Sequence, residues 1–409
     1  MHRCTCASGA TTALAVTVDE RWGDVDFELS EEQREFRDFA KGWVDSLYPK
    51  NKANQLEGED IVFPEGLWKD MADAGFHGIG IDEEYGGQGG DAMTQVILAR
   101  ELARNLAGLA AVWGTSSFAG GKTISSQGNE EQKQRFLPGI AAGELKFSIS
   151  ITEPAGGTDV IGAMRTNARR VDGGWRINGQ KIWTTGGLAA DYLVVMARTG
   201  ETNSSKTMTS FIVDAKSEGV TIRKIPKLGM RSMASCEVFY DDVFVPDDLV
   251  LGEPGQGWYQ LLPSLNNERI QVGGFCLGFL DGILEDALAY LDERTAFGHK
   301  IGEFQALQHY VADIATARVQ TELLTYKAAW LQSNDLPCGL EATMAKMVAS
   351  EHTSRAADLG IQMLGGMGYS METNMQRYWR DSRIYRIAPV TTEMAKNIIA
   401  QQLGLPRSF

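Results

Sequence analysis

Apolar residues recur at helical spacing through the first part of the chain. Ser30, followed by two acidic residues, is a plausible N-cap for the first of these helices. A glycine-rich segment at 85–90 interrupts the pattern before a second apolar run at 93–109, and helical signals continue to about Pro138. The pattern predicts an N-terminal helical domain over residues 28–146.

From Lys146 onward, apolar and polar residues alternate with a period of two, which is typical of a half-buried strand. Asp172-Gly173-Gly174 is a hairpin signal between two further strands. More strand candidates follow at residues 192–197, 209–213, 220–225 and 237–240. Short strands joined by polar turns predict an antiparallel β-barrel or sandwich domain over residues 147–262.

The helical period returns after Pro263, where leucines fall on one face of a long segment and a second apolar face follows it. Residues 263–409 are therefore predicted to form a C-terminal helical bundle. Because a β-domain lies between two helical domains, the expected fold class is α+β. No internal repeat or long linker separates the three parts, so the domains are expected to pack together. Residues 1–27 carry only one short apolar stretch and are predicted to be a disordered tail, or to reflect a start assigned too early.

Charge and cysteine content narrow the classes of function. The chain has 409 residues and a formal net charge of −14, which would repel a phosphate backbone, so nucleic acid is not an expected partner. A few local Arg and Lys residues could still hold the phosphates of CoA. The five cysteines fit neither a disulfide framework nor a zinc site, which favours a reducing cytoplasm. The apolar stretch at 13–18 is too short for a membrane span.

Several familiar catalytic motifs are absent from the sequence. Gly120-Gly121-Lys122-Thr123 resembles the end of a phosphate-binding loop, but Ser116 stands where the first glycine should be and no strand is expected before it. No GxGxxG motif follows a strand, no GxSxG motif occurs, and the five histidines lack metal-ligand spacing. Nucleotide-triphosphate, NAD, serine-hydrolase and metal sites are therefore not expected.

Two strand ends remain as candidates for cofactor binding. The segment 151–159 runs from a strand into a turn with Pro, Gly and hydroxyl residues, and its backbone N–H groups could face a flat, acceptor-rich ring. A plain hairpin loop explains this segment equally well. The segment 181–186 ends a second strand, where Trp183 beside two threonines could stack on the same ring. A tryptophan on a strand is more often a core residue, so both alternatives stay open.

Short motifs follow one another along nearly the whole chain. They are Glu83-Glu84-Tyr85-Gly86-Gly87, Gly128-Asn129-Glu130-Glu131-Gln132-Lys133, Leu137-Pro138, Thr152-Glu153-Pro154, Gly157-Thr158-Asp159, Lys181-Ile182-Trp183-Thr184-Thr185, Leu228-Gly229-Met230-Arg231, Asp242-Val243-Phe244-Val245-Pro246, Arg294-Thr295-Ala296-Phe297-Gly298 and Gln362-Met363-Leu364-Gly365-Gly366. Each motif is weak alone, but the ordered set is specific. From about Leu29 to its end, the chain resembles the acyl-CoA dehydrogenase family.

The resemblance implies FAD held between the β-domain and a C-terminal four-helix bundle. The isoalloxazine ring would lie against Ile151, Thr152, Gly157, Thr158, Trp183, Thr184 and Thr185. The adenosine and pyrophosphate contacts, which the family usually makes across a dimer interface, would come from Arg294, Phe297, Gln305, Gln362, Gly365 and Gly366. Thr391 and Glu393 would be further cofactor residues. The family's usual assembly is a homotetramer, so a homo-oligomer, either dimer or tetramer, is expected.

The reaction implied is α,β-dehydrogenation of an acyl thioester, as in fatty acid metabolism. A carboxylate removes the α-proton, and the β-hydrogen leaves as a hydride to the flavin. In many family members the base is a Glu directly before Gly-Thr near the C-terminus, and alignment places Pro389 at that position. Proline has neither a carboxylate nor an N–H group, so the usual base and one donor to the thioester carbonyl are both missing.

A second position can supply the base. A branch of the family that resembles isovaleryl- and long-chain enzymes carries it in a Glu-Arg pair on a helix of the C-terminal domain, and this sequence has that pair at Glu268-Arg269. Glu268 is therefore the candidate base, since an apolar pocket would raise its pKa towards neutrality. The alternative is an acid in the first turn of a helix, favoured by the helix dipole. Thr158, Asn266 and Arg269 are candidate substrate contacts.

Three hypotheses about function follow from these residues. The first is a dehydrogenase that acts on an acyl-CoA or an acyl-carrier protein and passes electrons to an electron-transfer flavoprotein. The second is a flavin-dependent oxidase or monooxygenase on the same fold, which Pro389 keeps open. The third is an acyl-thioester binding protein without turnover. The motifs do not distinguish CoA from a carrier protein and do not set the length or branching of the acyl chain.

Overall fold

The structure is a computed structural model that describes residues 28–58, 61–201 and 204–407. The tail predicted for residues 1–27 lies outside the described residues. Helices form the first part of the chain: α1 (Glu31–Leu47), α2 (Lys50–Gly58), α3 (Glu65–Asp73), α4 (Ala92–Leu106), α5 (Ala111–Ser116), α6 (Thr123–Gln127) and α7 (Glu130–Ala141). The N-cap predicted for the first helix is confirmed, because the Ser30 hydroxyl accepts a hydrogen bond from Gln33 N at 3.1 Å.

The middle part of the chain is a β-sheet with one short helix. Its elements are β1 (Phe147–Ser150), α8 (Val160–Ala163), β2 (Asn167–Val171), β3 (Gly174–Thr185), β4 (Tyr192–Arg198), β5 (Met208–Asp214), β6 (Val220–Ile225), β7 (Ser235–Pro246) and β8 (Val250–Leu251). The strand order is β6-β7-β3-β2-β4-β5-β8, with β1 beside β4. Most neighbours are antiparallel, and the predicted hairpin turn at Asp172-Gly173 joins β2 to β3.

The sheet is mixed rather than purely antiparallel. β1 pairs in parallel with β4, so that Phe147 lies opposite Tyr192. The chain leaves β1 through α8 and the β2–β3 hairpin before it returns as β4, and such a long connection permits parallel pairing. The residue pattern of β1 does not reveal the direction of its partner.

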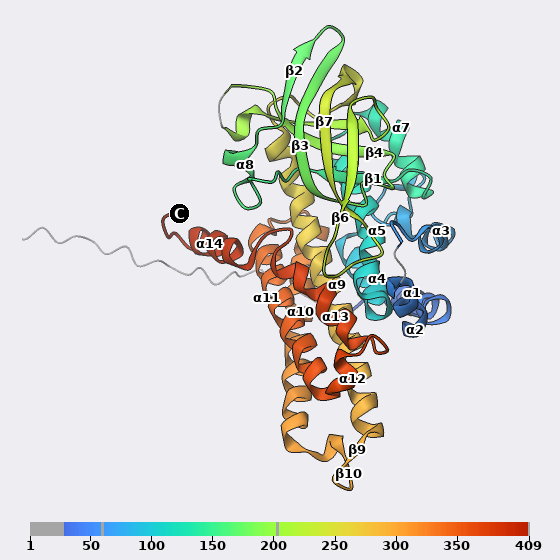
Figure 1. Cartoon of the computed structure of the whole chain (residues 1–409). Helices are drawn as coiled ribbons and strands as arrows, with labels where there is room; N and C mark the ends of the chain where they lie inside the picture. Colours follow the sequence, from blue (N-terminus) through green and yellow to red (C-terminus); the bar gives the residue numbers. More distant parts are fainter. Residues whose placement is uncertain (1–27, 59–60, 202–203, 408–409) are drawn as a thin grey trace, which may run out of the picture.

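The last part of the chain is a helical bundle, as predicted. Its elements are α9 (Gly257–Glu293), the hairpin strands β9 (Thr295–Ala296) and β10 (His299–Lys300), α10 (Gln305–Ser333), α11 (Gly339–Leu364), α12 (Gly366–Tyr369), α13 (Met375–Ser382) and α14 (Thr392–Gln402). In Figure 1, α9 runs from the β-sheet at one end of the molecule towards the β9–β10 hairpin at the other. The α+β fold class with helical first and last parts is thus confirmed.

Helix α9 begins earlier than the sequence pattern indicates. It starts at Gly257, and Pro263 lies inside it. Pro263 has no N–H group, so the hydrogen bond that a residue at this position would donate to the carbonyl oxygen of Tyr259 is missing. Tyr259 and Leu262 are exposed, so water can reach this turn. The proline is therefore tolerated without ending the helix.

Glycines on α9 bring it into close contact with α4. A Cβ atom added at Gly278 would lie 2.2 Å from the carbonyl oxygen of Arg100, and one added at Gly282 would lie 2.5 Å from that of Arg104. Any larger residue at these two positions would push the helices apart. The glycine spacing of α9 therefore sets where this helix lies against the N-terminal helices.

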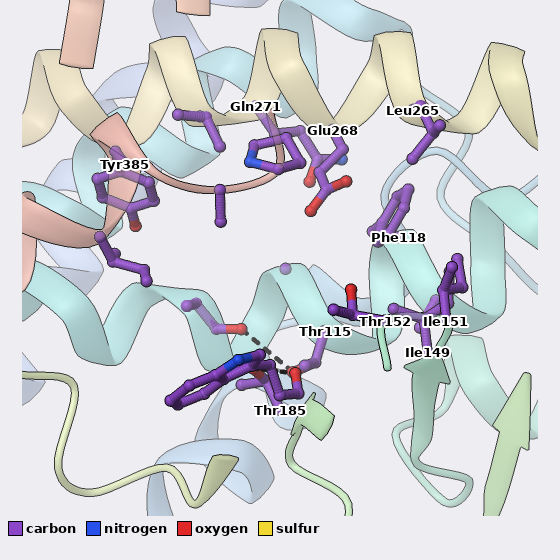
Figure 2. Close-up of a pocket in the computed structure, with 18 of the residues that line it drawn as sticks. Thr115, Phe118, Ile149, Ile151, Thr152, Thr185, Leu265, Glu268, Gln271 and Tyr385 are labelled. Atoms are coloured by element: carbon purple, nitrogen blue, oxygen red, sulfur yellow. Dashed lines mark hydrogen bonds between the residues drawn. The ribbon is translucent and has the colours of Figure 1, made fainter. Parts of the chain in front are cut away.

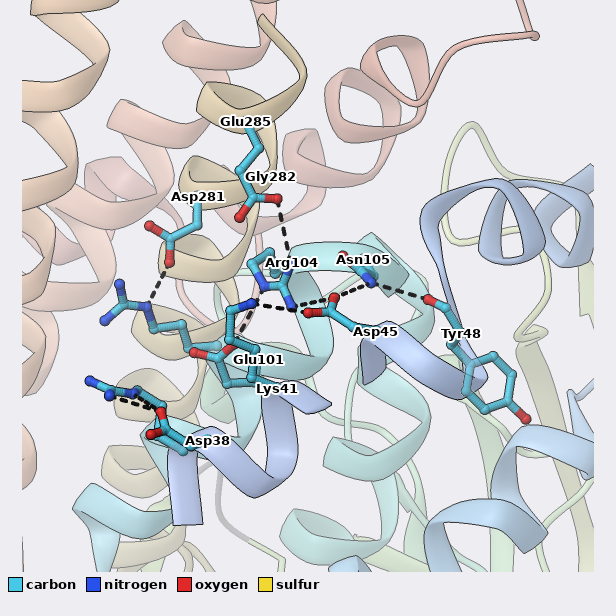
Figure 3. Close-up of polar contacts among 12 residues, drawn as sticks. Asp38, Lys41, Asp45, Tyr48, Glu101, Arg104, Asn105, Asp281, Gly282 and Glu285 are labelled. Atoms are coloured by element: carbon cyan, nitrogen blue, oxygen red, sulfur yellow. Dashed lines mark hydrogen bonds and ion pairs between the residues drawn. The ribbon is translucent and has the colours of Figure 1, made fainter. Parts of the chain in front are cut away.

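A polar network crosses the same contact and ties α1 to α4 and α9 (Figure 3). The Arg104 guanidinium, which is largely buried, contacts Asp45 at 2.6 Å, Glu101 at 3.4 Å and Glu285 at 3.5 Å. Asn105 donates a second hydrogen bond to Asp45 at 3.1 Å. The Glu101 carboxylate is buried with only this guanidinium as an ion-pair partner among the described residues. Arg104 thus compensates a buried charge between the helices.

We expect Arg104→Met to destabilise the protein by about 3 kcal/mol, because it removes the direct ion-pair partner of the buried Glu101 carboxylate and the contact with Asp45. The measurement is the free energy of unfolding in urea. Lys69→Met, which breaks only the exposed ion pair with Asp73, is the control and should leave stability unchanged within error. Equal effects of the two substitutions would contradict the role given to Arg104.

None of the helices in the described residues combines the length and the apolar character that crossing a membrane requires.

Candidate functional site

A cavity of about 340 Å³ lies between the β-sheet, α5, α9 and the C-terminal segment. Its walls are mostly apolar, and its polar side chains include Thr115, Thr152, Thr185, Gln271 and Tyr385. Among the described residues that line the cavity, Glu268 is the only charged one. Figure 2 shows α9 along one side of the cavity and the strand ends along the other. The cavity therefore presents one carboxyl group within largely apolar surroundings.

Trp183 lies on the strand wall and is not a core residue. The pairing of β3 with β7 is irregular between Lys181 and Thr184, and Trp183 within this stretch has a φ of 65°. A bulge of this kind reorients a side chain relative to the sheet. The indole consequently lines the cavity and is 54% exposed. The alternative that Trp183 is a core residue is therefore wrong. The alternation of apolar and polar residues along the strand does not reveal the bulge that exposes this side chain.

The two strand-end segments meet at the cavity, but not all of their residues reach it. Ile151, Thr152, Gly157, Trp183 and Thr185 line the cavity. The other two predicted ring contacts lie elsewhere, since Thr184 is buried with its hydroxyl 3.0 Å from that of Ser150, and Thr158 is exposed and outside the lining.

A buried ion pair holds the first of these segments in place. Lys181 Nζ donates to Ile151 O at 2.8 Å and to Glu153 Oε1 at 3.0 Å. Glu153 also accepts hydrogen bonds from the backbone N–H groups of Arg165 and Thr166. Burial lowers the pKa of Lys181 to about 8, although Glu153 acts in the opposite direction. These contacts fix the strand end that carries the cavity-lining hydroxyl and make a plain hairpin loop an incomplete description of it.

Glu268 points into the cavity from the interior of α9 (Figure 2). Because α9 starts at Gly257, Glu268 lies about three turns from its N-terminus, and the first-turn interpretation is wrong. Burial raises the pKa of Glu268 to about 7, while the charges of Arg269 and Lys346 act to lower it. Pro389 lines the same cavity from the C-terminal segment. The two positions considered for a base thus face one space from different elements.

Sequence reasoning missed Lys346, which lies on α11. Its side chain is fully buried, and its Nζ donates to Val390 O at 2.5 Å. Burial lowers its pKa to about 8. A lysine on a helix is usually exposed, so nothing in the local pattern marks this one. Lys346 supplies positive charge to the surroundings of Glu268 and anchors the segment next to Pro389.

Family models match nearly the whole described chain. The N-terminal, middle and C-terminal domains of acyl-CoA dehydrogenases match residues 30–144, 148–243 and 255–404. The chain belongs to the acyl-CoA dehydrogenase family. Members of this family are FAD-dependent oxidoreductases.

The relatives of this family member include several CoA-thioester dehydrogenases. Benzylmalonyl-CoA dehydrogenase of Aromatoleum aromaticum is 36% identical over 93% of this chain and 100% of its own length. Mitochondrial isovaleryl-CoA dehydrogenase of Arabidopsis thaliana is 35% identical over 83% of this chain and 84% of its own length. Both match over most of the chain, so the likeness extends beyond a single domain.

Solved structures agree with this assignment. Butyryl-CoA dehydrogenase of Megasphaera elsdenii superposes with a TM-score of 0.89 at 30% identity, covering 93% of this chain and 100% of that one. The prolyl acyl carrier protein oxidase AnaB has a TM-score of 0.88 at 27% identity and covers 92% and 100%. An FAD complex of PigA has a TM-score of 0.88 at 25% identity and covers 93% and 100%.

The cavity of this acyl-CoA dehydrogenase family member fits FAD. Trp183, held in a left-handed backbone conformation, turns an exposed indole towards the cavity, and a flat aromatic ring can stack on it. Apart from its two neighbours in the chain, no described residue has a heavy atom within 4 Å of the position that a Cβ would take at Gly157, so the backbone there is open to a ligand. The Thr152 and Thr185 hydroxyls lie on the same wall. No group of metal-binding side chains occurs in the described residues.

The remaining predicted residues do not line the cavity of a single chain. Arg269 donates to Asn266 Oδ1 at 2.8 Å, and both lie outside the cavity lining. Phe297 is 94% exposed at the tip of the β9–β10 hairpin, far from the sheet (Figure 1). The other residues outside the lining are Arg294, Gln305, Gln362, Gly365, Gly366, Thr391 and Glu393. These residues therefore do not contact the part of a ligand that lies inside the cavity.

We expect Lys346→Met to raise the pKa of Glu268 above about 7, because it removes a positive charge that favours the carboxylate. Infrared difference titration against Glu268→Gln isolates the carboxyl band of Glu268. Its midpoint should lie near pH 7 in the parent protein and higher in Lys346→Met. Arg355→Met, an exposed change on the same helix, is the control and should not move the midpoint. An unchanged midpoint in Lys346→Met would refute the coupling.

Proposed function

We propose that the protein is an acyl-thioester dehydrogenase that forms the 2-enoyl thioester, with Glu268 as the base. One observation carries the proposal: the Glu268 carboxyl group and the Trp183 indole line the same apolar cavity from different elements. An acyl thioester placed between the two walls would have its α-carbon within reach of a carboxylate. The family supplies the class of reaction, and the position of Glu268 supplies the base that Pro389 cannot provide.

The protonation state of Glu268 suits this role. With a pKa of about 7, the carboxyl group is roughly half deprotonated at neutral pH and can accept a proton. The apolar walls, which include Leu265 and Phe118, exclude water and so keep the proton on Glu268 during the reaction. Burial thus raises the pKa of Glu268 and also keeps water away from its carboxyl group.

The strand wall would hold the cofactor. Trp183, Thr152 and Thr185 would contact the isoalloxazine, together with the open backbone at Gly157. FAD, when bound, supplies the acceptor for the β-hydride. Pro389 contributes an apolar surface and no hydrogen-bond donor.

An anaerobic titration with a panel of acyl-CoA and acyl-carrier-protein thioesters tests the proposal. We expect at least one saturated thioester to bleach the flavin absorbance and to yield the 2-enoyl product. Glu268→Gln should slow bleaching by about 1000-fold, since loss of a general base costs on the order of 100–10,000-fold. Glu372→Gln, an exposed change away from the cavity, is the control. Bleaching by Glu268→Gln at the parent rate would refute the proposal.

An oxidase or monooxygenase is the second candidate function, which the similarity to AnaB and the proline at position 389 favour. The same titration distinguishes it from a dehydrogenase. An oxidase would return to the oxidised spectrum within seconds when air is admitted, with one peroxide formed per product. A dehydrogenase would be reoxidised rapidly only by an electron-transfer flavoprotein. A relative, the caffeyl-CoA reductase–Etf complex subunit CarC of Acetobacterium woodii, is 34% identical over 92% of this chain, which supports this acceptor.

We further propose a homo-oligomer in which the hairpin residues Arg294 and Phe297, with Gln305, contact the cofactor of a partner subunit. Their exposure and their distance from the cavity support this arrangement. We expect Arg294→Ala to lower the FAD content of the purified protein several-fold, measured as the ratio of flavin to protein absorbance, because a guanidinium pairs well with a diphosphate. Arg355→Ala is the control. An unchanged FAD content in Arg294→Ala would contradict this interface.

A further inference from the structure

Segment 154–164, which connects β1 to β2, forms part of the cavity wall. Gly157 and Val160, the first residue of α8, both line the cavity. Apart from Gly156, residues 154–159 are exposed, so this part of the segment buries little surface of its own. A segment with few buried contacts has little local stability. Its position against the cavity is therefore set by contacts at its two ends.

The carboxylate of Glu153 joins the two ends of the segment. Glu153 comes directly before it, and the two residues directly after it are Arg165 and Thr166. Glu153 Oε2 accepts a hydrogen bond from Arg165 N at 2.7 Å, and Oε1 accepts one from Thr166 N at 2.8 Å. One buried side chain thus closes segment 154–164 into a loop whose ends lie side by side.

Lys181 on β3 supplies the charge that balances this carboxylate. Its side chain is fully buried, and Nζ donates to Glu153 Oε1 at 3.0 Å and to Ile151 O at 2.8 Å. Although burial acts to raise the pKa of Glu153, the charge of Lys181 and the backbone hydrogen bonds hold this pKa below its ordinary value. A buried ion pair is often no more stabilising than apolar residues of similar volume. The pair at this position therefore points to a role in fixing geometry.

A second buried cation, Arg198 at the end of β4, holds the other half of the segment. Its Nη2 donates to Ile161 O at 2.7 Å, and its Nε donates to Met164 O at 3.3 Å. Its Nη1 donates to Thr207 Oγ1 at 2.8 Å, next to the start of β5. These bonds attach α8 to the sheet and keep Val160 at the cavity wall.

We propose that Glu153, Lys181 and Arg198 form a clamp that holds segment 154–164 in the position that binds FAD. None of the three lines the cavity, so they are positioning residues that act on the cofactor through Thr152 and Gly157. Thr152 lies on the strand wall in Figure 2, directly before the clamped carboxylate. The inference rests on the proposed function, because it takes this wall as the site of the isoalloxazine.

The test removes both charges of the pair in one protein, Lys181→Met with Glu153→Gln. No uncompensated buried charge then remains, but the single amide oxygen of glutamine cannot replace two carboxylate oxygens. We expect the dissociation constant of FAD, measured by equilibrium dialysis of the FAD-loaded protein, to rise about 10-fold, the scale of one lost hydrogen bond. Amide hydrogen exchange across residues 154–166 should become faster in the same protein.

Arg104→Met is the matched control, because it breaks a buried ion pair that has no part in the cavity lining. It should lower stability but leave the dissociation constant of FAD unchanged within error. Equal weakening of FAD binding by Arg104→Met would show that lost stability explains the effect, and would overturn the inference. Unchanged FAD binding in the double variant, or weaker binding without faster exchange in residues 154–166, would also overturn it.

Arg198→Lys tests the clamp even if the double variant does not fold. Lysine keeps the charge but lacks the planar fork that reaches two carbonyl groups and a hydroxyl at once. This variant should also weaken FAD binding and speed exchange within α8, and parent values for both would contradict the clamp.

Trp183→Leu separates failure of the clamp from failure of the proposed function. If Trp183→Leu binds FAD as tightly as the parent, the placement of the isoalloxazine on the strand wall is wrong. If Trp183→Leu weakens FAD binding while the double variant and Arg198→Lys do not, the placement stands and the clamp alone is refuted.

Discussion

The position of the candidate base depends on the close contact between α4 and α9. Carbonyl groups of α4 occupy the space that side chains would take at Gly278 and Gly282, so α9 has little freedom to slide or rotate. Glu268 is carried by the same helix, which also forms a wall of the cavity. Its position relative to the strand wall is therefore set by helix packing. A base that must reach one carbon atom is better placed on such an element than on a loop.

Buried charge is the second constraint, and it is balanced differently at the two ends of α9. Near Gly282, the carboxylate of Glu101 has a direct partner in Arg104, and the result is a structural network. In the cavity, Glu268 has only the more diffuse influence of Arg269 and Lys346, and its pKa stays near 7. Burial raises the pKa of Glu101 too, while Arg100 and Arg104 act to lower it, so the two carboxylates differ in whether they have a direct ion-pair partner and not in the direction of the shift.

The sequence was sufficient to predict the three-part architecture and the Ser30 cap, which depend on local periodicity, and its motifs pointed to Glu268, which lines the cavity. The alternation of residues could not choose between a core and a cavity position for Trp183, because the bulge that exposes it is set by the pairing of β3 with β7. Lys346 carries no local signal, since its role arises from groups distant in the chain, the Val390 carbonyl and the Glu268 carboxyl. Long-range contacts, rather than residue types, decide which polar groups face the cavity.

The most direct test of the central claim isolates proton transfer from oxidation. A thioester that has α-hydrogens but no β-hydrogen, such as a 3-thiaacyl-CoA, cannot lose a hydride, yet a base in the cavity can still exchange its α-hydrogens with deuterium oxide. Exchange is followed by NMR with the FAD-loaded parent protein and with Glu268→Gln. The account predicts exchange catalysed by the parent and none above background in the variant. Undiminished exchange in Glu268→Gln would show that another group removes the α-proton.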